Sequence, residues 1–405
     1  MMIVKIEKGV ANGNVSAPPS KSMAHRMLIC AALCEGESKV TGISDCVDVS
    51  ATLGCMRALG INVNLDGNDV TVEGKNTNCL IAKNTLDCKE SGSTLRFLIP
   101  LALCTGKTVM FSGAKSLMQR PMGVYENICK ERGLNYIADG ETITVKGPIK
   151  SGEFTVVGNI SSQFISGLLF ALPLLKGDSR IKITPPIESR SYIEMTRSAQ
   201  ALFGVKSVWE DEHTLFIAGG QKYLATNVSV EGDYSGAAFP DALNLFGGSV
   251  TVNGLNPNSI QGDAVYKKFY DMLCKGVPTV YIGDCPDLGP ILFAVAAAKN
   301  GGVFSGTKRL KIKESDRAQA MAEELQKFGT AVTVFDDKVV VYPASFHPPK
   351  KPINSHNDHR IAMACAILLT MTGGEIEGAE AVSKSYPSFF EHLKSLGIGV
   401  KEYDA

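Results

Sequence analysis

The sequence predicts an α/β fold in two domains, each built from three copies of one structural unit. One pattern recurs six times along the 405 residues: a polar motif, an apolar helix, a glycine, a short strand, an amphipathic helix and a strand hairpin. Most copies span roughly seventy residues, the size of a βαβ-type unit with an added hairpin. The apolar helices carry almost no charge, so we expect them to be buried on all sides, with the amphipathic helices nearer solvent.

The first three copies follow this order closely. Their apolar helices are predicted at residues 28–33, 95–103 and 164–175. A glycine follows each of them and suits a helix C-cap, where φ is often positive: Gly36, Gly106 and Gly177. The amphipathic helices are predicted to end at Gly60, Gly133 and Gly204 and to lead into hairpins that include residues 61–63 with 70–72, 143–145 and 215–217.

The last three copies have apolar helices predicted at residues 237–246, 291–298 and 361–372. The fourth copy has a strand at 250–252 and a shortened second half near Gly276. The sixth copy stops soon after Gly397 without its final hairpin strand, which the alternating residues 1–5 could supply. We therefore expect an N-terminal lobe of residues 15–230 and a C-terminal lobe of residues 1–14 plus 231–405.

Composition excludes several classes of protein. Lys+Arg and Asp+Glu both number 41, aromatic residues make up only 7%, and there is no basic run, which argues against a binder of nucleic acid or of membrane surfaces. The eleven cysteines form no C-x-x-C pair and are expected as small buried residues in a reducing compartment. His356 and His359 lack partners at zinc-site spacing and are predicted to be structural or anion-site residues, with no metal.

The cellular location is predicted from the absence of a signal peptide and of a membrane-spanning segment in the sequence. The N-terminus has no signal-peptide core, and the apolar run 361–372 is too short to cross a membrane. We therefore expect a soluble, cytoplasmic protein.

Polar residues at the helix starts are the candidate functional residues. The prolines of residues 18–26 (PPSKSMAHR) hold the chain extended, and the serines after them can cap the helix that follows. Free N–H groups at a helix start, beside Lys21 and Arg26, can bind an anion. The alternative is an ordinary capped surface helix with two solvated cations.

Recurrence of this arrangement favours the anion site. Similar motifs open the other predicted helices, at residues 91–96, 120–121, 161–163, 189–192, 232–233, 287–290, 313–317, 358–360 and 384–387. If the helices of each domain run parallel, their positive ends emerge on one face, and two such faces across a cleft would attract a polyanionic ligand. The planar fork of arginine suits phosphate and carboxylate, so the candidates are Arg96, Arg120, Arg317 and Arg360.

Two carboxylates among these motifs have open interpretations. Glu314 could be a general acid or base held among cations, or it could only neutralise charge near a Ser315 helix cap. Asp287 could take part in catalysis, or it could only be the N-cap of the helix that follows it.

These motifs resemble the EPSP synthase (3-phosphoshikimate 1-carboxyvinyltransferase) family. The residues that carry the resemblance occur in the family's order over nearly the whole chain: Lys21-Ser22 with Arg26, Ser91-Gly92-Ser93 with Arg96, Gln119-Arg120-Pro121, Ser161-Ser162-Gln163, Lys313-Glu314-Ser315-Asp316-Arg317, Asp358-His359-Arg360 and Ser383-Lys384-Ser385-Tyr386-Pro387. The resemblance implies a two-domain inside-out α/β barrel with three βαβαββ units and buried parallel helices in each domain. It also implies transfer of the enolpyruvyl group of phosphoenolpyruvate to the 5-hydroxyl of shikimate 3-phosphate in an interdomain cleft, with release of phosphate and without a cofactor. That reaction belongs to chorismate and aromatic amino acid biosynthesis.

The resemblance further implies roles for individual residues. Shikimate 3-phosphate should contact Lys21, Ser22, Arg26, Ser161, Ser162, Gln163, Ser189, Asp287 and Lys313, with Tyr192 packing nearby. Phosphoenolpyruvate should contact Lys21, Gly92, Arg120, Gln163, Arg317, Arg360 and Lys384. The catalytic residues would be Asp287, which accepts the 5-hydroxyl proton, Glu314, which protonates the methylene carbon, and Lys21. Addition would be followed by elimination through a tetrahedral intermediate.

Two positions depart from the family pattern. Glu90 precedes Ser91-Gly92 where Asn is more frequent, and Arg309 stands where many relatives have Asn, which could alter the shikimate-phosphate pocket. Gly92 lets the backbone approach phosphoenolpyruvate closely. We expect sensitivity to glyphosate, weakened in Gly92→Ala.

Two other functions remain open at this point. A related enolpyruvyl transferase acts on UDP-N-acetylglucosamine, but the 313–317 and 358–360 motifs and the double-serine pocket argue against it. A catalytically silent anion-binding protein of the same fold is the second, and the presence of both Asp287 and Glu314 argues against that. The expected partners are the two small-molecule substrates, with no nucleic acid and no membrane, and the expected state is a monomer.

Overall fold

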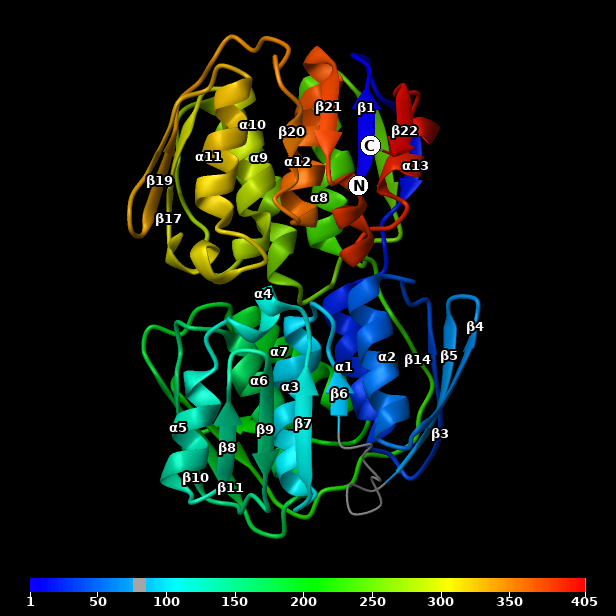
Figure 1. Ribbon diagram of the computed structural model, residues 1–405, viewed down its shortest axis with the longest axis vertical. Helices are drawn as coiled ribbons and strands as arrows, with labels where there is room; N and C mark the ends of the chain where they lie inside the picture. Colours follow the sequence, from blue (N-terminus) through cyan, green and yellow to red (C-terminus); the bar gives the residue numbers. More distant parts are fainter. Residues whose placement is uncertain (76–84, 405) are drawn as a thin grey trace. The chain divides into compact units, whose positions relative to one another are not determined.

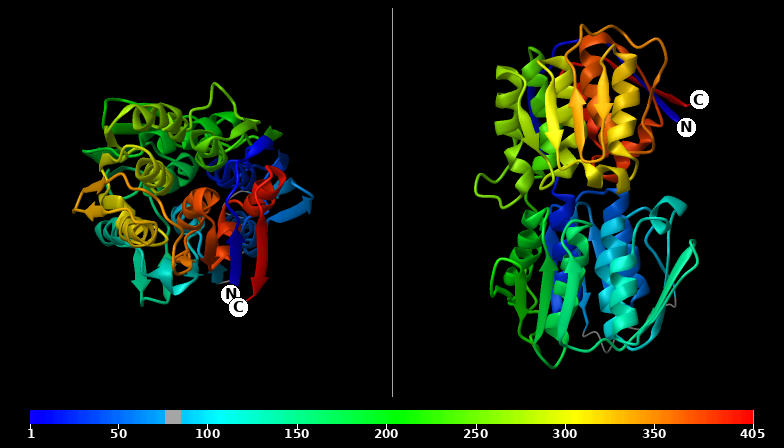
Figure 2. Two further views of the ribbon diagram at one scale, coloured as in Figure 1. Left: turned by 90° about the horizontal axis from the view of Figure 1, so that it is seen from above. Right: turned by 90° about the vertical axis from the view of Figure 1, so that its left-hand side faces the viewer.

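The computed structural model describes residues 1–75 and 85–404 and is shown in Figure 1. The chain divides into two compact units, each with its own hydrophobic core. Unit 1 consists of Met1–Pro18 with Gly232–Ala405, and unit 2 consists of Pro19–Glu231. The two further views in Figure 2 show sheets at the outside of each unit with helices packed behind them.

Three four-stranded sheets of one topology make up the described strands of unit 2. In each sheet the first two strands pair in parallel and the other neighbours pair antiparallel. In β5, Val70 and Val72 are fully buried and alternate with Thr71, which is the period expected of a half-buried strand. In sheet order the strands are β14 (Val228–Ser229), β3 (Gly36–Thr41), β5 (Asp69–Gly74) and β4 (Asn62–Asp66); β6 (Thr85–Asp87), β7 (Thr108–Ser112), β9 (Thr142–Lys146) and β8 (Asn135–Ala138); β10 (Glu153–Val157), β11 (Ser179–Thr184), β13 (Thr214–Ile217) and β12 (Val208–Trp209).

The helices of unit 2 form a buried set and an outer set. The buried helices are α1 (Lys21–Ala32), α3 (Gly92–Cys104) and α6 (Ser162–Ala171). The outer helices are α2 (Val47–Ala58), α5 (Gly123–Glu131), α7 (Arg190–Leu202) and the short α4 (Lys115–Met118). The predicted helix 164–175 was too long, because α6 stops at Ala171 and continues only as a 3-10 turn, Leu172–Leu174, that contains Pro173. Proline has no N–H to extend the helical ladder.

Unit 1 contains two sheets with that topology and one two-stranded sheet among its described residues. In the second four-stranded sheet β1 lies between β21 and β22 and runs antiparallel to both, the position that β19 has in the first. Figure 1 shows β1 beside β22, with both chain ends there. The strands are β16 (Thr279–Tyr281), β17 (Gly302–Ser305), β19 (Lys338–Val341) and β18 (Val332–Val334); β20 (Ile353–Asn354), β21 (Gly374–Glu377), β1 (Met2–Ile6) and β22 (Val400–Asp404); β15 (Ser249–Asn253) and β2 (Asn12–Ser16).

The helices of unit 1 divide in the same way. The buried helices are α8 (Tyr234–Ala242), α10 (Gly289–Ala298) and α12 (His359–Thr372), and the outer ones are α9 (Tyr266–Lys275), α11 (Arg317–Lys327) and α13 (Phe389–Ser395). The predicted helix 237–246 was also too long, since α8 ends at Ala242 and a 3-10 turn, Leu243–Phe246, leads to Gly247 with φ of 91°. Further 3-10 turns are Gly262–Val265, Pro286–Leu288, Lys308–Ile312 and Ala379–Lys384.

Most cysteines of the described chain are buried free thiols; Cys104 is half-buried and Cys274 exposed. Over residues 1–75 and 85–404, no helix has the length and apolar character needed to span a bilayer.

Candidate active site

The starts of the buried helices other than α10 are capped by side chains, as the sequence indicates. In unit 2 the cap oxygens belong to Ser20, Ser91 and Ser161, and in unit 1 to Asp233 and Asp358. Each cap satisfies one of the N–H groups that a helix start leaves without an intrahelical partner, and the remaining N–H groups keep the positive end of the helix dipole.

Helix starts meet within each unit. In unit 2, Arg96 Nη1 on α3 donates to Gln163 Oε1 on α6 over 2.8 Å, and Gln163 Nε2 donates to Ser93 Oγ over 2.9 Å. In unit 1, Arg360 Nη2 on α12 donates to Ser235 Oγ on α8 over 3.0 Å. The buried helices of each unit therefore point their positive ends to one region.

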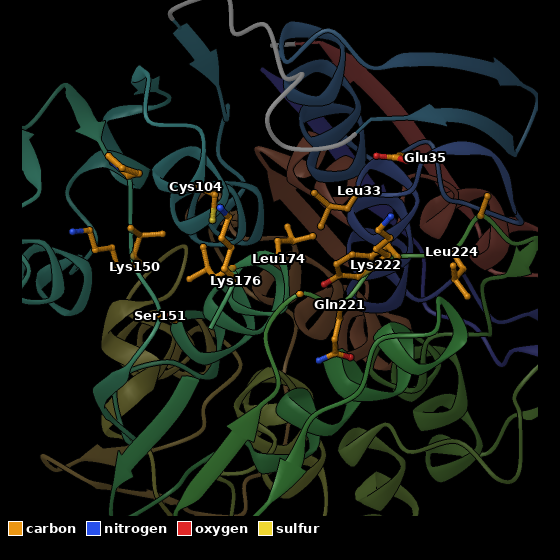
Figure 3. Close-up of a pocket in the computed structure, with 16 residues that line it drawn as sticks. Leu33, Glu35, Cys104, Lys150, Ser151, Leu174, Lys176, Gln221, Lys222 and Leu224 are labelled. Atoms are coloured by element: carbon orange, nitrogen blue, oxygen red, sulfur yellow. The ribbon is translucent and has the colours of Figure 1, made fainter. Parts of the chain in front are cut away.

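A cavity at the other end of unit 2 supports the same orientation (Figure 3). Its volume is about 880 Å³, and Leu33, Cys104 and Leu174 line it from the C-terminal ends of α1, α3 and the turn after α6. Three helices that share a C-terminal end run parallel. No predicted site residue lines this cavity, which a helix of twelve residues separates from the helix starts by roughly 18 Å.

Lys21 and Arg26 on α1 have different surroundings. Lys21 Nζ donates to Asp48 Oδ2 on α2 over 2.8 Å. Arg26 is buried, and its nitrogens donate to Thr196 Oγ1 and to the carbonyls of Ser22 and Tyr192. Burial lowers the pKa of Arg26 to about 10, and its guanidinium also lies over the rings of Phe97 and Tyr192. Arg26 thus fixes backbone near the helix start from inside the unit.

Gly92 opens α3 in a crowded position. A Cβ placed there would lie 2.9 Å from Arg120 Nη1, 2.9 Å from Arg96 Nη1 and 3.7 Å from Gln163 Oε1. The first two distances are shorter than real Cβ contacts, so a side chain at this position must displace the guanidinium groups. Gly92, Arg120 and Gln163 therefore form one polar group, as their shared predicted ligand requires.

Ser189 lies at the start of α7 with φ of 57°, a left-handed conformation that is uncommon for serine. It is buried, as is Ser162, which opens α6. Such strained residues tend to lie at functional sites. The predicted group Ser161, Ser162, Ser189 and Tyr192 thus occupies the starts of two helices that pack together, α6 and α7.

Arg317 is the centre of the candidate site in unit 1. Its side chain is 1% exposed, and its nitrogens reach Asp287 Oδ1 at 2.8 Å, Glu314 Oε2 at 2.7 Å and Asp358 Oδ2 at 2.8 Å. Asp287 Oδ2 also accepts from Arg360 Nη2 over 3.0 Å. One guanidinium thereby holds both predicted catalytic carboxylates, Asp287 and Glu314, beside each other.

Both non-catalytic alternatives for these carboxylates were wrong about the helix caps. Asp287 is not the N-cap of α10, because the helix begins at Gly289 with Leu288 as its cap residue. The cap of α11 is Asp316, whose side chain accepts from the Gln319 N–H, while Ser315 Oγ donates to Asp358 Oδ2 over 3.1 Å.

Lys313 completes the unit 1 group. Its Nζ lies 3.5 Å from Asp287 Oδ1. Burial, together with the charges of Arg309 and Arg317, lowers the pKa of Lys313 to about 8 although Asp287 opposes this. Arg309 itself is buried and donates to the Gly283 carbonyl over 3.3 Å. Arg309 therefore lies close enough for its charge to act on Lys313.

Lys384 and the histidines lie around the start of α12. Lys384 is buried and its Nζ donates to the Asn357 carbonyl over 2.6 Å. His359 is buried on α12, and His356 Nε2 lies 2.9 Å from Glu324 Oε1. Within the described ranges, no three His, Cys, Asp or Glu side chains are grouped so that they could hold a metal ion.

Sequence reasoning missed three supporting residues: Asp48, Thr196 and Ser235. Asp48 is an acid in the first turn of α2, an ordinary feature that carries no signal of its contact with Lys21. Thr196 and Ser235 are small polar residues whose partners lie more than a hundred positions away in the sequence.

Fold and geometry together define a class: an α/β repeat protein whose helix starts present cations, with two carboxylates bridged by one arginine. The chain belongs to the EPSP synthase (3-phosphoshikimate 1-carboxyvinyltransferase) family, whose model matches residues 6–277 and 274–393. The 3-phosphoshikimate 1-carboxyvinyltransferases of Clostridium acetobutylicum and Clostridium kluyveri are 40% and 37% identical to it, over 100% of this chain and 99% of theirs. These matches favour this family over enolpyruvyl transfer to UDP-N-acetylglucosamine.

A solved structure agrees on the fold. The EPSP synthase from Acinetobacter baumannii superimposes with a TM-score of 0.80 at 22% identity, over 100% of both chains. The predicted two-domain inside-out α/β barrel is therefore confirmed.

Proposed function

We propose that this protein transfers the enolpyruvyl group of phosphoenolpyruvate to the 5-hydroxyl of shikimate 3-phosphate, giving 5-enolpyruvylshikimate 3-phosphate and phosphate. The observation that carries the proposal is Arg317, which joins Asp287 and Glu314 within 2.8 Å. A base and an acid held side by side among cations suit an addition to an anionic substrate. Units 2 and 1 are proposed to correspond to the two lobes, which the sequence predicted at residues 15–230 and at 1–14 plus 231–405, in a monomeric cytoplasmic enzyme.

The substrates are proposed to draw on both units. Shikimate 3-phosphate is bound mainly by unit 2, through Lys21, Ser22, Ser161, Ser162, Gln163 and Ser189, with Asp287 and Lys313 from unit 1. Phosphoenolpyruvate is bound by Lys21, Gly92, Arg120 and Gln163 together with Arg317, Arg360 and Lys384. Because the nitrogens of Arg26 donate to Thr196 and to the carbonyls of Ser22 and Tyr192, Arg26 contributes by holding Ser22 and Tyr192 in place.

The proposed reaction has two steps. In the addition, the 5-hydroxyl oxygen attacks C2 of phosphoenolpyruvate, Asp287 takes the hydroxyl proton and Glu314 delivers a proton to the methylene carbon. In the elimination, the C2–O bond to phosphate breaks, the Glu314 carboxylate takes a proton back from the new methyl group, which restores the double bond, and the proton held by Asp287 leaves with the phosphate. Lys21, Arg120 and Arg317 stabilise the charge on the phosphate and carboxylate in the tetrahedral intermediate.

The direct test is phosphate release when both substrates are added together, with each alone as control. We expect release only from the pair. Binding of both compounds without any release would instead indicate a silent anion-binding protein.

Gly92→Ala should raise the KM for phosphoenolpyruvate severalfold and weaken inhibition by glyphosate by a larger factor. The added methyl group would meet the Arg120 and Arg96 guanidinium groups at 2.9 Å and displace them. Inhibition curves at fixed phosphoenolpyruvate measure the effect. Gly123→Ala is the control, since a Cβ there meets nothing within 4 Å. Unchanged glyphosate inhibition in Gly92→Ala would contradict the placement of Gly92.

The pKa of Lys313 predicts a pH dependence. Lys313 loses its proton as pH rises through about 8, and the neutral amine no longer attracts phosphate. The kcat/KM for shikimate 3-phosphate should therefore fall as pH rises above that value. The arginine of Lys313→Arg keeps its charge over this pH range. The decrease in kcat/KM above about pH 8 should therefore be absent in this variant. A decrease that persists unchanged in Lys313→Arg would assign the titration to another group.

A further inference from the structure

The turn that leads into α12 has an unusual backbone. His356 and Asn357 have φ of 50° and 53°, two consecutive left-handed residues that are not glycine. The left-handed conformation is unfavourable for residues that have a Cβ. Surrounding contacts must therefore hold this turn in place.

A buried carboxylate on the neighbouring helix α11 supplies those contacts. Glu324 is 2% exposed, and its Oε2 accepts from the Asn354 N–H over 2.9 Å and lies 2.7 Å from Lys327 Nζ. Its Oε1 lies 2.9 Å from His356 Nε2. Burial would raise the pKa of Glu324, but the hydrogen bonds from His356, Lys327 and Asn354 outweigh it and lower that pKa. Glu324 thus contacts the turn at two points, the Asn354 N–H and the His356 side chain.

This turn contacts three residues of the candidate site, two of them through their charged groups. The Asn357 carbonyl accepts from Lys384 Nζ over 2.6 Å. Asp358 Oδ2 accepts from Arg317 Nε over 2.8 Å, and Asp358 Oδ1 accepts from the backbone N–H of Arg360 over 2.9 Å as the N-cap of α12, which fixes where the Arg360 side chain starts. Lys384, Arg317 and Arg360 are the unit 1 residues proposed for phosphoenolpyruvate, and all three contact this one turn.

We propose that Glu324 and His356 are positioning residues that fix the 354–358 turn and, through it, the phosphoenolpyruvate-binding cations of unit 1. This inference rests on the proposed function. Neither side chain is proposed to touch substrate, and their effect is on where Lys384, Arg317 and Arg360 stand. A shift of about 1 Å at groups that position a substrate costs up to roughly 100-fold in rate.

The test compares two neighbouring glutamates. Glu324→Gln removes the negative charge beside Lys327 and replaces one acceptor oxygen with an NH₂ group, so the hydrogen bonds to His356, Lys327 and the Asn354 N–H cannot all be kept as they are. Glu323→Gln is the matched control, because Glu323 is 51% exposed and lies 3.9 Å from His356. We expect Glu324→Gln to raise the KM for phosphoenolpyruvate by roughly 10-fold or more, with the KM for shikimate 3-phosphate within twofold of wild type. Glu323→Gln should leave both constants unchanged.

The histidine gives a second, independent variant. His356→Phe should raise the KM for phosphoenolpyruvate in the same way, and His356→Gln, which keeps a donor toward Glu324, should restore it to within about threefold of wild type. Equal effects of Glu324→Gln and Glu323→Gln, or equal increases in both KM values, would overturn the proposal. So would a failure of His356→Gln to rescue.

A calorimetric arm separates this inference from the proposed function. Binding of phosphoenolpyruvate without shikimate 3-phosphate is titrated for wild type and each variant, so that no turnover can take place. If wild type binds but releases no phosphate, the proposed function fails. The positioning role of Glu324 is then still judged by the loss of phosphoenolpyruvate affinity in Glu324→Gln. Unaltered affinity in that variant would overturn the positioning role of Glu324 even if the wild-type protein converts both substrates.

Discussion

Asp287→Asn should reduce phosphate release by two to four orders of magnitude while both substrates still bind. Removal of a general base typically costs 10²–10⁴-fold in rate. Asparagine keeps the shape of aspartate and one acceptor oxygen, so the contacts with Arg317 at 2.8 Å and Arg360 at 3.0 Å are only partly lost. The amide cannot take the 5-hydroxyl proton, and this is the expected cause of the lost turnover.

Affinity for the substrates should not fall together with turnover in Asp287→Asn. The carboxylate compensates the charges of Lys313, Arg317 and Arg360. Once it is neutral, the group carries more positive charge, so affinity for the anionic substrates should be unchanged or higher. Calorimetric titration together with single-turnover phosphate release separates the two effects. Near-normal turnover would remove Asp287 from the mechanism.

Glu314→Gln provides the companion measurement for the proposed acid. It should also lose turnover with binding retained, because an amide cannot deliver a proton to the methylene carbon. Asp271→Asn is the control, a carboxylate of α9 that is more than half exposed and pairs only with Lys275 at 2.6 Å among the contacts described. Full activity in that control shows that loss of a carboxylate alone is harmless.

Repetition made most of the fold predictable from the sequence. Apolar runs such as 95–103 lie inside α3, and glycines such as Gly60 and Gly133 have the positive φ expected after a helix. Helix ends were less predictable where an apolar run continued past a break, as at Pro173. Hydrophobicity alone does not distinguish an α-helix from the 3-10 turn that prolongs it.

The candidate site was predictable as a set of motifs but not as a set of contacts. A basic residue at a helix start gives a local signal, which is why Lys21 and Arg317 were found. Whether it faces ligand or protein depends on residues far away in the chain, and Arg26 shows this because its partner Thr196 lies 170 positions later. Cap residues were ambiguous for a simpler reason: Ser315 and Asp316 are adjacent and both are good caps.

Arg317→Met should cause a large loss of stability in unit 1. Methionine has a similar length but no charge, so Asp287, Glu314 and the fully buried Asp358 lose their shared cation. These carboxylates raise the pKa of Arg317 above its usual value despite burial. Removing one partner of a buried ion pair costs about 3–5 kcal/mol, because the charges that remain are uncompensated. At roughly 2–4 °C per kcal/mol for a unit of this size, the unfolding temperature of unit 1 should fall by roughly 6–20 °C in scanning calorimetry.

Two comparisons show whether burial of the ion pairs causes the loss of stability in Arg317→Met. Arg180→Met removes an exposed partner of Glu210, where the side chains are 41% and 37% exposed, and should cost less than about 1 kcal/mol. Arg317→Lys keeps the charge, but one ammonium cannot match the planar fork that reaches three carboxylates, so its loss should be intermediate. If Arg317→Met and Arg180→Met lowered the unfolding temperature equally, Arg317 would not be the centre of the unit 1 site. Since Asp287 and Glu314 depend on this guanidinium for their placement, activity should disappear in Arg317→Met even at temperatures where it remains folded.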